Sequence, residues 1–281
     1  NEARIGVGMG AAVLGYRGYR QSVAYAKDRR QGRRLGSAEK ASIPIIEHAD
    51  VRRMLLQQKA YSEIAIAICL FCSHLQGQKT KESESLLGIL TPVAKSWPSE
   101  FCLIANDLAI QVHGGCGYTR DFDVEQLWRD NRLNPIHEGT TGIQALDLLG
   151  RKILRSDGKP LAILRDRVAD TVARAERSVA LAVHAKAVHD YWASIDDAIE
   201  TLKSAQGTDA YNDATLFLRA FGHGVAAWIW LDLALSADRL VSVVHVLRYF
   251  IESELPLARS WLSIASRHLD TAAAAPDAIF D

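Results

Sequence analysis

The sequence predicts an all-α protein made of two helical bundles in series. Apolar residues recur at helical spacing along nearly every long segment, and alternating strand patterns are almost absent. The 281-residue chain is 48% hydrophobic, which is enough for a sizeable core. The stretch RSDGKP, residues 155–160, is polar, contains glycine and ends in proline, so it is the best boundary between the bundles. We therefore expect one domain at residues 1–154 and another at residues 155–281.

The first domain is expected to hold three long helices and then two short ones. In chain order they cover residues 2–30, 44–77 and 86–112, followed by residues 122–132 and a helix that begins near residue 141. Pro44 suits a first helical turn, whereas Pro92 and Pro98 mark places where the third helix would kink. The polar stretches RRQGRRLGSAEKAS and GQKTKESES are expected to be loops.

Three early glycines, Gly6, Gly8 and Gly10, superficially match a nucleotide-binding loop. No strand precedes them, and the third spacing is wrong for the GxGxxG pattern. We therefore expect these glycines to allow close packing between helices.

The second domain is expected to contain helices at about residues 161–192, 210–237 and 255–269. Residues 216–235, LFLRAFGHGVAAWIWLDLAL, are apolar nearly all round, which predicts a buried helix. Its aromatic residues fit a core or an oligomer interface better than a cofactor site; they are Phe217, Trp228 and Trp230. The histidines show no ligand spacing with acidic residues, and we expect them to be satisfied or exposed; they are His184, His189, His223, His245 and His268.

Composition excludes several classes of partner. The 33 basic and 33 acidic residues give zero net charge, which argues against nucleic acid or an anionic membrane as the main partner. No apolar run is expected to span a membrane. The opening NEARIGVG lacks the features of a signal peptide, so secretion is not indicated. Because the chain opens without methionine and inside a predicted helix, we expect a fragment or a processed chain.

The four cysteines are too few for a disulfide scaffold, and they favour a reducing, cytoplasmic location. Cys69 and Cys72 form a CxxC motif, but they lie in a stretch with helical apolar spacing. No second cysteine pair or histidine cluster completes a tetrahedral site. We expect helix core here and no metal site.

Two glycine-rich turns bracket a charged segment between His113 and Gln144. In the first turn, HGGCGYTRD, glycines would let backbone N–H groups approach a phosphate, and a helix follows closely. A helix C-cap explains the same residues. In the second turn, IHEGTTG, Glu138 would cap the next helix, act as a general base in a partly buried cleft, or be solvated. The residues alone leave these interpretations open.

The ordered pattern QVHGGCGYTRDFDVEQLWRDNRLNPIHEGTTGIQ resembles the signature that ends the C-terminal helical domain of acyl-CoA dehydrogenases. Upstream, YAKDRRQGR and PIIEHADVRRML support the resemblance, which covers about residues 1–153. The remaining tail, with YNDATLFLRAFGHGVAAWIW, resembles the branch that includes 3-methylmercaptopropionyl-CoA dehydrogenases. The resemblance implies a four-helix-bundle C-terminal domain followed by an additional helical C-terminal domain.

The resemblance also implies an FAD-dependent flavoprotein that oxidises an acyl-CoA thioester between its α and β carbons. Glu138 matches the base that removes the α-proton while the β-hydrogen leaves as hydride to flavin N5. Enclosure beside an acyl chain would desolvate this carboxylate and strengthen it as a base. An electron-transfer flavoprotein is the implied electron acceptor, and the implied assembly is a homodimer or homotetramer. An oxidase that passes electrons to oxygen is a close alternative.

Further site residues follow from matching positions. The predicted cofactor contacts are Arg29 and Gln31 near an FAD phosphate, Gln111, Gly114 and Gly115 at the ADP half of a neighbouring subunit's FAD, and Thr140 beside the flavin. The predicted substrate contacts are Arg4, at the CoA portion, and Gly139.

Several positions depart from the family pattern near the predicted cofactor contacts. Gly32 and Arg33 replace the usual aromatic residue and glycine, His137 stands where tyrosine is common, and Gly142 where glutamine often touches the flavin. The family's N-terminal helical and central β domains are not in these residues, so this chain alone is expected to be inactive and to hold FAD incompletely. A non-catalytic oligomerisation or interaction module therefore stays open. A DNA-binding relative is disfavoured by the zero net charge.

Overall fold

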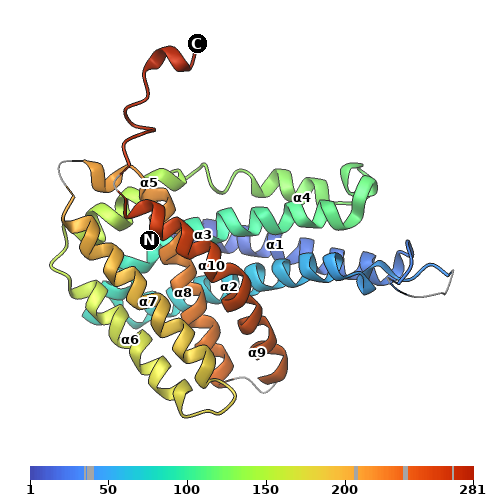
Figure 1. Cartoon of the computed structure of the whole chain (residues 1–281), viewed down its shortest axis with the longest axis horizontal. Helices are drawn as coiled ribbons and strands as arrows, with labels where there is room; N and C mark the ends of the chain where they lie inside the picture. The colour runs from blue at the N-terminus through green and yellow to red at the C-terminus, as the bar shows by residue number, and fades with distance from the viewer. Residues whose placement is uncertain (35, 37–40, 206–207, 237–239, 268) are drawn as a thin grey trace. The chain divides into compact units, whose positions relative to one another are not determined.

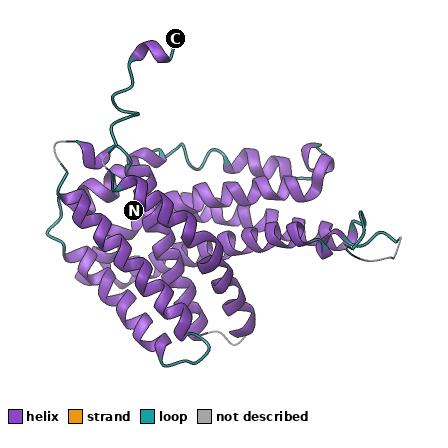
Figure 2. Cartoon of the chain, in the orientation of Figure 1, coloured by secondary structure: helices purple, strands orange, loops and turns teal. Residues whose placement is uncertain are grey.

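The computed structural model describes residues 1–34, 36, 41–205, 208–236, 240–267 and 269–281. Within these ranges every regular element is helical, and the one extended pairing is an isolated bridge between Arg30 and Pro44 (Figure 2). The all-α prediction is confirmed.

The longer helices are labelled in Figure 1. In chain order they are α1 (Glu2–Asp28), α2 (Ala49–Gln78), α3 (Lys81–His113), α4 (Val124–Asn131), α5 (Thr141–Leu146), α6 (Lys159–Glu176), α7 (Ala182–Lys203), α8 (Ala214–Ser236), α9 (Leu240–Tyr249) and α10 (Leu255–Ala265). Short 3-10 turns occupy η1 (Ile45–Glu47), η2 (Gly114–Tyr118), η4 (Asp209–Tyr211) and η6 (Asp277–Ile279). Two π-helical segments are η3 (Asp147–Leu154) and η5 (Phe250–Glu254).

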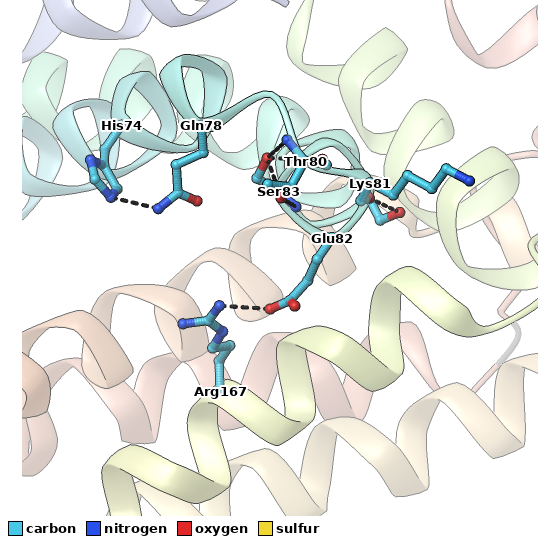
Figure 3. Close-up of polar contacts among 8 residues, drawn as sticks. His74, Gln78, Thr80, Lys81, Glu82, Ser83 and Arg167 are labelled. Carbon is cyan, nitrogen blue, oxygen red and sulfur yellow. Dashed lines mark hydrogen bonds and ion pairs between the residues drawn. The ribbon is translucent and has the colours of Figure 1, made fainter.

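The predicted loop GQKTKESES is wrong, because α3 already begins at Lys81. Thr80 and Ser83 cap this helix reciprocally: Ser83 N donates to Thr80 Oγ1 at 3.1 Å, and Thr80 N donates to Ser83 Oγ at 2.9 Å (Figure 3). Such a capping box satisfies two backbone donors at a helix start. The turn between α2 and α3 therefore shrinks to two residues, with Lys79 in the left-handed region at φ 53°. Beyond it, α3 runs through both of its prolines without a break.

The single helix predicted at residues 161–192 is also wrong. The chain turns at residues 177–181, and α6 and α7 pack against each other on either side of the turn. Neither glycine nor proline marks this turn, so the packing of two apolar helix faces decided it. The segment α9 with η5 was not predicted either. Residues 237 and 268, inside two of the predicted helices, lie outside the described residues.

The chain divides into two compact units that are not consecutive in sequence. We call Glu2–Phe71 with Ala94–Glu138 the early unit. The late unit comprises Cys72–Val93, Gly139–Asp281 and Asn1. The predicted domain boundary after residue 154 stays a prediction.

In the early unit, α1 packs closely on α3 through glycines. A Cβ atom added at Gly8 would stand 1.9 Å from the carbonyl oxygen of Ala94, and one at Gly15 would stand 2.7 Å from Cβ of Cys102. By contrast, nothing lies within 4 Å of the corresponding position at Gly6 or Gly10. The predicted packing role therefore holds for Gly8 and not for the other two early glycines.

In the late unit, α6, α7 and α8 lie side by side (Figure 1). As predicted, α8 is buried along most of its length, and Phe217, Trp228 and Trp230 belong to the core. Trp228 Nε1 donates to Thr171 Oγ1 at 2.9 Å, which satisfies a buried indole donor.

Two helices correct the expectation that no apolar segment reaches membrane length. By length and composition alone, α2 and α8 are each long and apolar enough to cross a membrane, because each contains an 18-residue stretch with a mean hydropathy of 1.2. The structure buries 56% of this stretch in α2 and 83% of it in α8, as expected for core helices. Length and hydropathy are therefore weak evidence for a membrane span here.

Candidate functional site

The first glycine turn begins where α3 ends at His113. Gly114, the first residue of η2, has a φ of 62°, a left-handed conformation that caps a helix and favours glycine. Gly114 and Gly115 are exposed, and nothing lies within 4 Å of where their Cβ atoms would stand. The backbone at Gly114 is that of a helix C-cap, as one of the two interpretations expected. The turn is also exposed, so its backbone N–H groups are accessible to a ligand. Gln111, in the last turn of α3, is exposed as well.

The side chain of Tyr25 connects this turn with Arg29. Its ring stacks on His113 with centroids 4.3 Å apart and meets Phe122 edge-on at 5.4 Å. Burial raises the pKa of Tyr25, a hydrogen bond with the Cys116 side chain adds to the rise, and the positive charge of Arg29 opposes it. Arg29 and the first glycine turn therefore lie at the same end of the early unit.

Arg29 and Gln31 are brought together as predicted. Arg29 Nη2 donates to Gln31 Oε1 at 3.3 Å, and both residues are exposed. Their backbone is fixed by Ile45 N, which donates to Arg29 O at 2.8 Å, and by Gln31 N, which donates to Ile43 O at 3.0 Å. An exposed guanidinium on a fixed backbone is suited to a phosphate.

Gly32 explains one departure from the family pattern. Its φ is 72°, and a Cβ atom there would stand 3.1 Å from the His48 ring. The His48 ring contacts Gln31 O through Nε2 at 2.8 Å. An aromatic residue at position 32 would strain the backbone and displace His48, so glycine suits the local geometry.

Glu138 has a backbone conformation that is uncommon for a residue with a side chain. Its φ is 54°, and Gly139 follows with a φ of 88°. This φ favours glycine at position 139, where a Cβ atom would also stand 2.6 Å from Gln144 Nε2. Thr140, which is exposed, is the N-cap residue of α5. Thr140, and not Glu138, therefore occupies the N-cap position, and it makes no side-chain capping hydrogen bond. The left-handed backbone at Glu138 is typical of functional sites.

The Glu138 side chain is exposed. Exposed apolar side chains flank it in the sequence, Leu133 at 56% and Ile136 at 49% before it, and Ile143 at 55% after it. The desolvation expected of a catalytic base in a cleft is therefore not provided by the described residues alone.

Arg4 lies far from Arg29. It is half-buried in the first turn of α1, whereas Arg29 directly follows the last turn. At about 1.5 Å of rise per residue, roughly 37 Å of helix separates the two arginines. The turn that precedes Glu138 contacts the N-terminal half of α1, because Asn131 Nδ2 donates to Ala11 O at 3.2 Å. Arg4 and the turn before Glu138 thus lie toward one end of α1, and Arg29 lies at the other.

A buried polar group in the early unit was missed by sequence reasoning. It contains Lys95 and three asparagines, Asn106, Asn131 and Asn134, each 9% exposed or less. Burial lowers the pKa of Lys95, and the negative charges of Glu100 and Glu138 act in the opposite direction. A lone lysine inside the apolar run TPVAKSW was the available signal, because a fully buried lysine is rare without a partner.

The cysteines fit the predicted core role. Cys69, Cys72 and Cys102 are buried and Cys116 is exposed, with no disulfide among the four. Burial raises the pKa of Cys72 to about 12, which disfavours the reactive thiolate. In the described part of the chain, no group of three or more His, Cys, Asp or Glu side chains is placed to hold a metal ion. His268 lies outside the described residues.

Residues 1–154 match the family model described as "Acyl-CoA dehydrogenase, C-terminal domain". The chain belongs to the acyl-CoA dehydrogenase family. Residues 164–276 match a second model, "Acetyl-CoA dehydrogenase C-terminal like". The resemblance seen in the sequence is thereby confirmed for both segments.

Curated acyl-CoA dehydrogenase relatives are longer than this chain. It is 33% identical to a 3-methylmercaptopropionyl-CoA dehydrogenase of Ruegeria pomeroyi, over 84% of this chain and 41% of the relative. It is 34% identical to the broad-specificity linear acyl-CoA dehydrogenase FadE5 of Mycobacterium tuberculosis, over 61% of this chain and 30% of the relative. The chain therefore spans less than half the length of these relatives.

Solved structures of family members share the fold. One is Caenorhabditis elegans ACDH-11 in complex with C11-CoA, with a TM-score of 0.72 and 17% identity over 97% of this chain and 47% of that one. Another is an acyl-CoA dehydrogenase from Bacillus anthracis complexed with FAD, with a TM-score of 0.69 and 18% identity over 99% of this chain and 50% of that one. At these identities the likeness shows the fold alone.

Proposed function

We propose that the protein carrying this chain catalyses the FAD-dependent α,β-dehydrogenation of an acyl-CoA thioester, with Glu138 as the base. The observation that carries the proposal is the backbone of Glu138, held in the left-handed region directly before Gly139 in a family signature. Such strain persists where the surrounding structure holds it, and it collects at active sites. Membership in the acyl-CoA dehydrogenase family supports the reaction class.

The residues of the early unit fit the phosphates of FAD. Arg29 offers an exposed, always-charged guanidinium, and Gly114 and Gly115 form an exposed turn without side chains at the same end of the unit. A fixed positive charge and closely approachable backbone N–H groups are what a pyrophosphate requires. We assign Arg29, Gln31, Gln111, Gly114 and Gly115 to cofactor binding. When bound, FAD supplies a hydride acceptor.

The reaction divides between named residues of this chain. Glu138 takes the proton from the carbon α to the thioester carbonyl, and Gly139 leaves room for the substrate beside that carboxylate. Thr140 contributes a hydroxyl beside the cofactor, and Arg4 binds the phosphate-rich CoA portion by charge. The exposed apolar residues around Glu138 are to be covered in the active assembly, which strengthens the base by desolvation.

Several properties of the whole protein belong to the same proposal. Its electron acceptor is an electron-transfer flavoprotein, and it works as a homodimer or homotetramer in the cytoplasm. One relative in the family is named as a subunit of a caffeyl-CoA reductase–Etf complex in Acetobacterium woodii, which supports the choice of acceptor. An assay with oxygen as the sole acceptor separates this proposal from an oxidase.

The test is the substitution Glu138→Gln in the complete protein. We expect yellow protein with unchanged flavin content and a reductive half-reaction slowed by roughly 10²–10⁴-fold, the range of a positioned general base. Stopped-flow bleaching of the flavin by acyl-CoA measures this step. Glu176→Gln, at an exposed position in the last turn of α6, is the matched control and should react at the wild-type rate.

Two results would contradict the proposal. Wild-type protein that is colourless and that FAD cannot reconstitute rules out the enzyme and leaves an interaction module. If Glu138→Gln loses flavin without a specific effect on rate, Glu138 is a structural residue and not the base.

A further inference from the structure

The turn that carries Glu138 is tied to a buried lysine. Lys95, in the middle of α3, has no exposed surface, and its Nζ donates to the backbone carbonyl oxygen of Asn134 at 2.8 Å. Asn134 lies four residues before Glu138 and precedes Pro135, so its carbonyl belongs to a tertiary amide in the turn. Burying an ammonium group is strongly unfavourable unless it is well compensated. The early unit therefore buries an ammonium group, which is unfavourable for stability, at the position where it holds this turn.

The side chains of Asn134, Asn131 and Asn106 form a chain of hydrogen bonds, which we call the asparagine relay, from this turn to α1. Asn134 Nδ2 donates to Asn131 Oδ1 at 2.9 Å, and Asn131 Nδ2 donates to Asn106 Oδ1 at 2.6 Å. Asn106 Nδ2 then donates to Leu14 O at 3.0 Å, which ends the relay on the backbone of α1. Each side-chain amide in this relay donates onward, an arrangement in which hydrogen bonds strengthen one another.

The packing of α1 leaves space for this relay. A Cβ atom at Gly18 would stand 2.6 Å from Asn106 Nδ2, so a side chain there would displace the amide. At the other end of the relay, His137 Nε2 lies 3.2 Å from Asn134 Oδ1, and since an amide oxygen only accepts, this nitrogen carries the proton. His137 is the residue directly before Glu138.

The charge of Lys95 also interacts with the proposed base. The carboxylates of Glu100 and Glu138 both stabilise the charged ammonium group against the effect of burial. Lys95 thus acts on the same turn in two ways: it fixes the backbone at Asn134, and its charge attracts the carboxylate of Glu138.

We propose that Lys95 is a positioning residue, which works with the asparagine relay to hold the turn that presents Glu138 to the substrate. The inference rests on the proposed function, because it takes Glu138 as the base. It adds a residue that does not touch the reacting atoms. Misplacing a catalytic group by about 1 Å costs on the order of 10²-fold in rate.

The test compares Lys95→Met with Gln58→Met in the complete protein. Gln58 on α2 is equally buried in the early unit, accepts from Ser22 Oγ at 3.0 Å and donates to Met54 O at 3.3 Å, so its loss also removes buried hydrogen bonds. We expect Lys95→Met to lower kcat by about 10- to 100-fold with KM and flavin content little changed. Gln58→Met should destabilise the fold and keep the wild-type kcat.

A double-mutant cycle separates positioning from general damage. If Lys95 acts through Glu138, Lys95→Met should slow Glu138→Gln protein by less than about 3-fold, because the group that it positions is already gone. Hydrogen exchange adds a readout that does not need activity: the amides of residues 136–140 should exchange faster in Lys95→Met and at the wild-type rate in Gln58→Met.

The outcomes distinguish this inference from the proposed function. If Glu138→Gln slows the reaction but Lys95→Met behaves as Gln58→Met does, the positioning role is wrong and the base stands. Equal losses from Lys95→Met in both backgrounds also overturn positioning. If Glu138→Gln reacts at the wild-type rate, both proposals fall. Where Lys95→Met does not fold, Asn134→Ala, which cuts the relay at Asn131 and His137, must show the same selective loss of kcat.

Discussion

The interiors of the two compact units differ in what they enclose beside apolar side chains. The early unit packs α1 on α3 at glycines and threads a lysine and three asparagines through its interior. The late unit surrounds α8, which is buried along most of its length and carries Phe217, Phe221, Trp228 and Trp230. Both units bury apolar side chains, since the early unit also encloses Tyr61, Trp97 and Phe101. The difference lies in the buried polar group of the early unit, in which Lys95 donates a hydrogen bond to the turn before Glu138.

The largest effect is expected from truncating the aromatic core of the late unit. Phe217 has no exposed surface and packs beside Phe221 with ring centroids 5.9 Å apart. Phe217→Ala should lower the free energy of unfolding by about 3–5 kcal/mol, because it loses buried apolar area and leaves a cavity. Urea denaturation followed by circular dichroism measures the change. Phe280→Ala, at a position that is 76% exposed, is the control and should leave stability unchanged.

A smaller loss is expected at the glycine contact of the early unit. Gly8→Ala would place a methyl group 1.9 Å from the backbone oxygen of Ala94, so the two helices must separate, at a cost of about 2–3 kcal/mol. Gly10→Ala meets nothing within 4 Å and should stabilise α1 by roughly 0.5–1 kcal/mol, because alanine favours a helix. Thermal unfolding of both variants compares them. Equal effects would show that close approach does not distinguish this unit.

The smallest expected effect is the pH dependence of stability that comes from His223, a histidine buried in the apolar core of the late unit. Burial lowers the pKa of His223 to about 3, against the opposing hydrogen bond to Arg219 O. An unfolded histidine has a pKa of about 6.5. As the pH falls below that value the unfolded chain takes up a proton and the native chain does not, so stability present above it is lost toward pH 3.

For His223 this loss is about 1 kcal/mol between pH 7 and pH 5.5. The measurement is urea unfolding as a function of pH. In His223→Gln this part of the pH dependence should disappear, whereas His245→Gln, at an exposed position of α9, should keep it. An unchanged pH dependence in His223→Gln would mean that His223 takes up its proton in the native state as readily as in the unfolded chain.

The sequence by itself determined the fold class and the family. Helical spacing of apolar residues is a local property, and so is the apolar character of α8, because both are written in consecutive positions. The order and spacing of the signature around Glu138 were equally local and led to Gly114 and Gly115, and the upstream motif YAKDRRQGR led to Arg29 and Gln31. The structure brings Arg29 together with Gln31, and Tyr25 connects Arg29 with the glycine turn.

Only the tertiary structure decided which side chains meet across the chain. The turn between α6 and α7 contains no glycine or proline, so it became visible only when two helix faces packed together. Gly8 and Gly10 look alike in sequence, yet one touches a neighbouring backbone and the other meets open space. Lys95 and Asn134 are 39 positions apart, and their hydrogen bond forms because α3 and the turn before Glu138 pack together in the early unit. Burial and such long-range pairings arise from packing, and no local pattern encodes them.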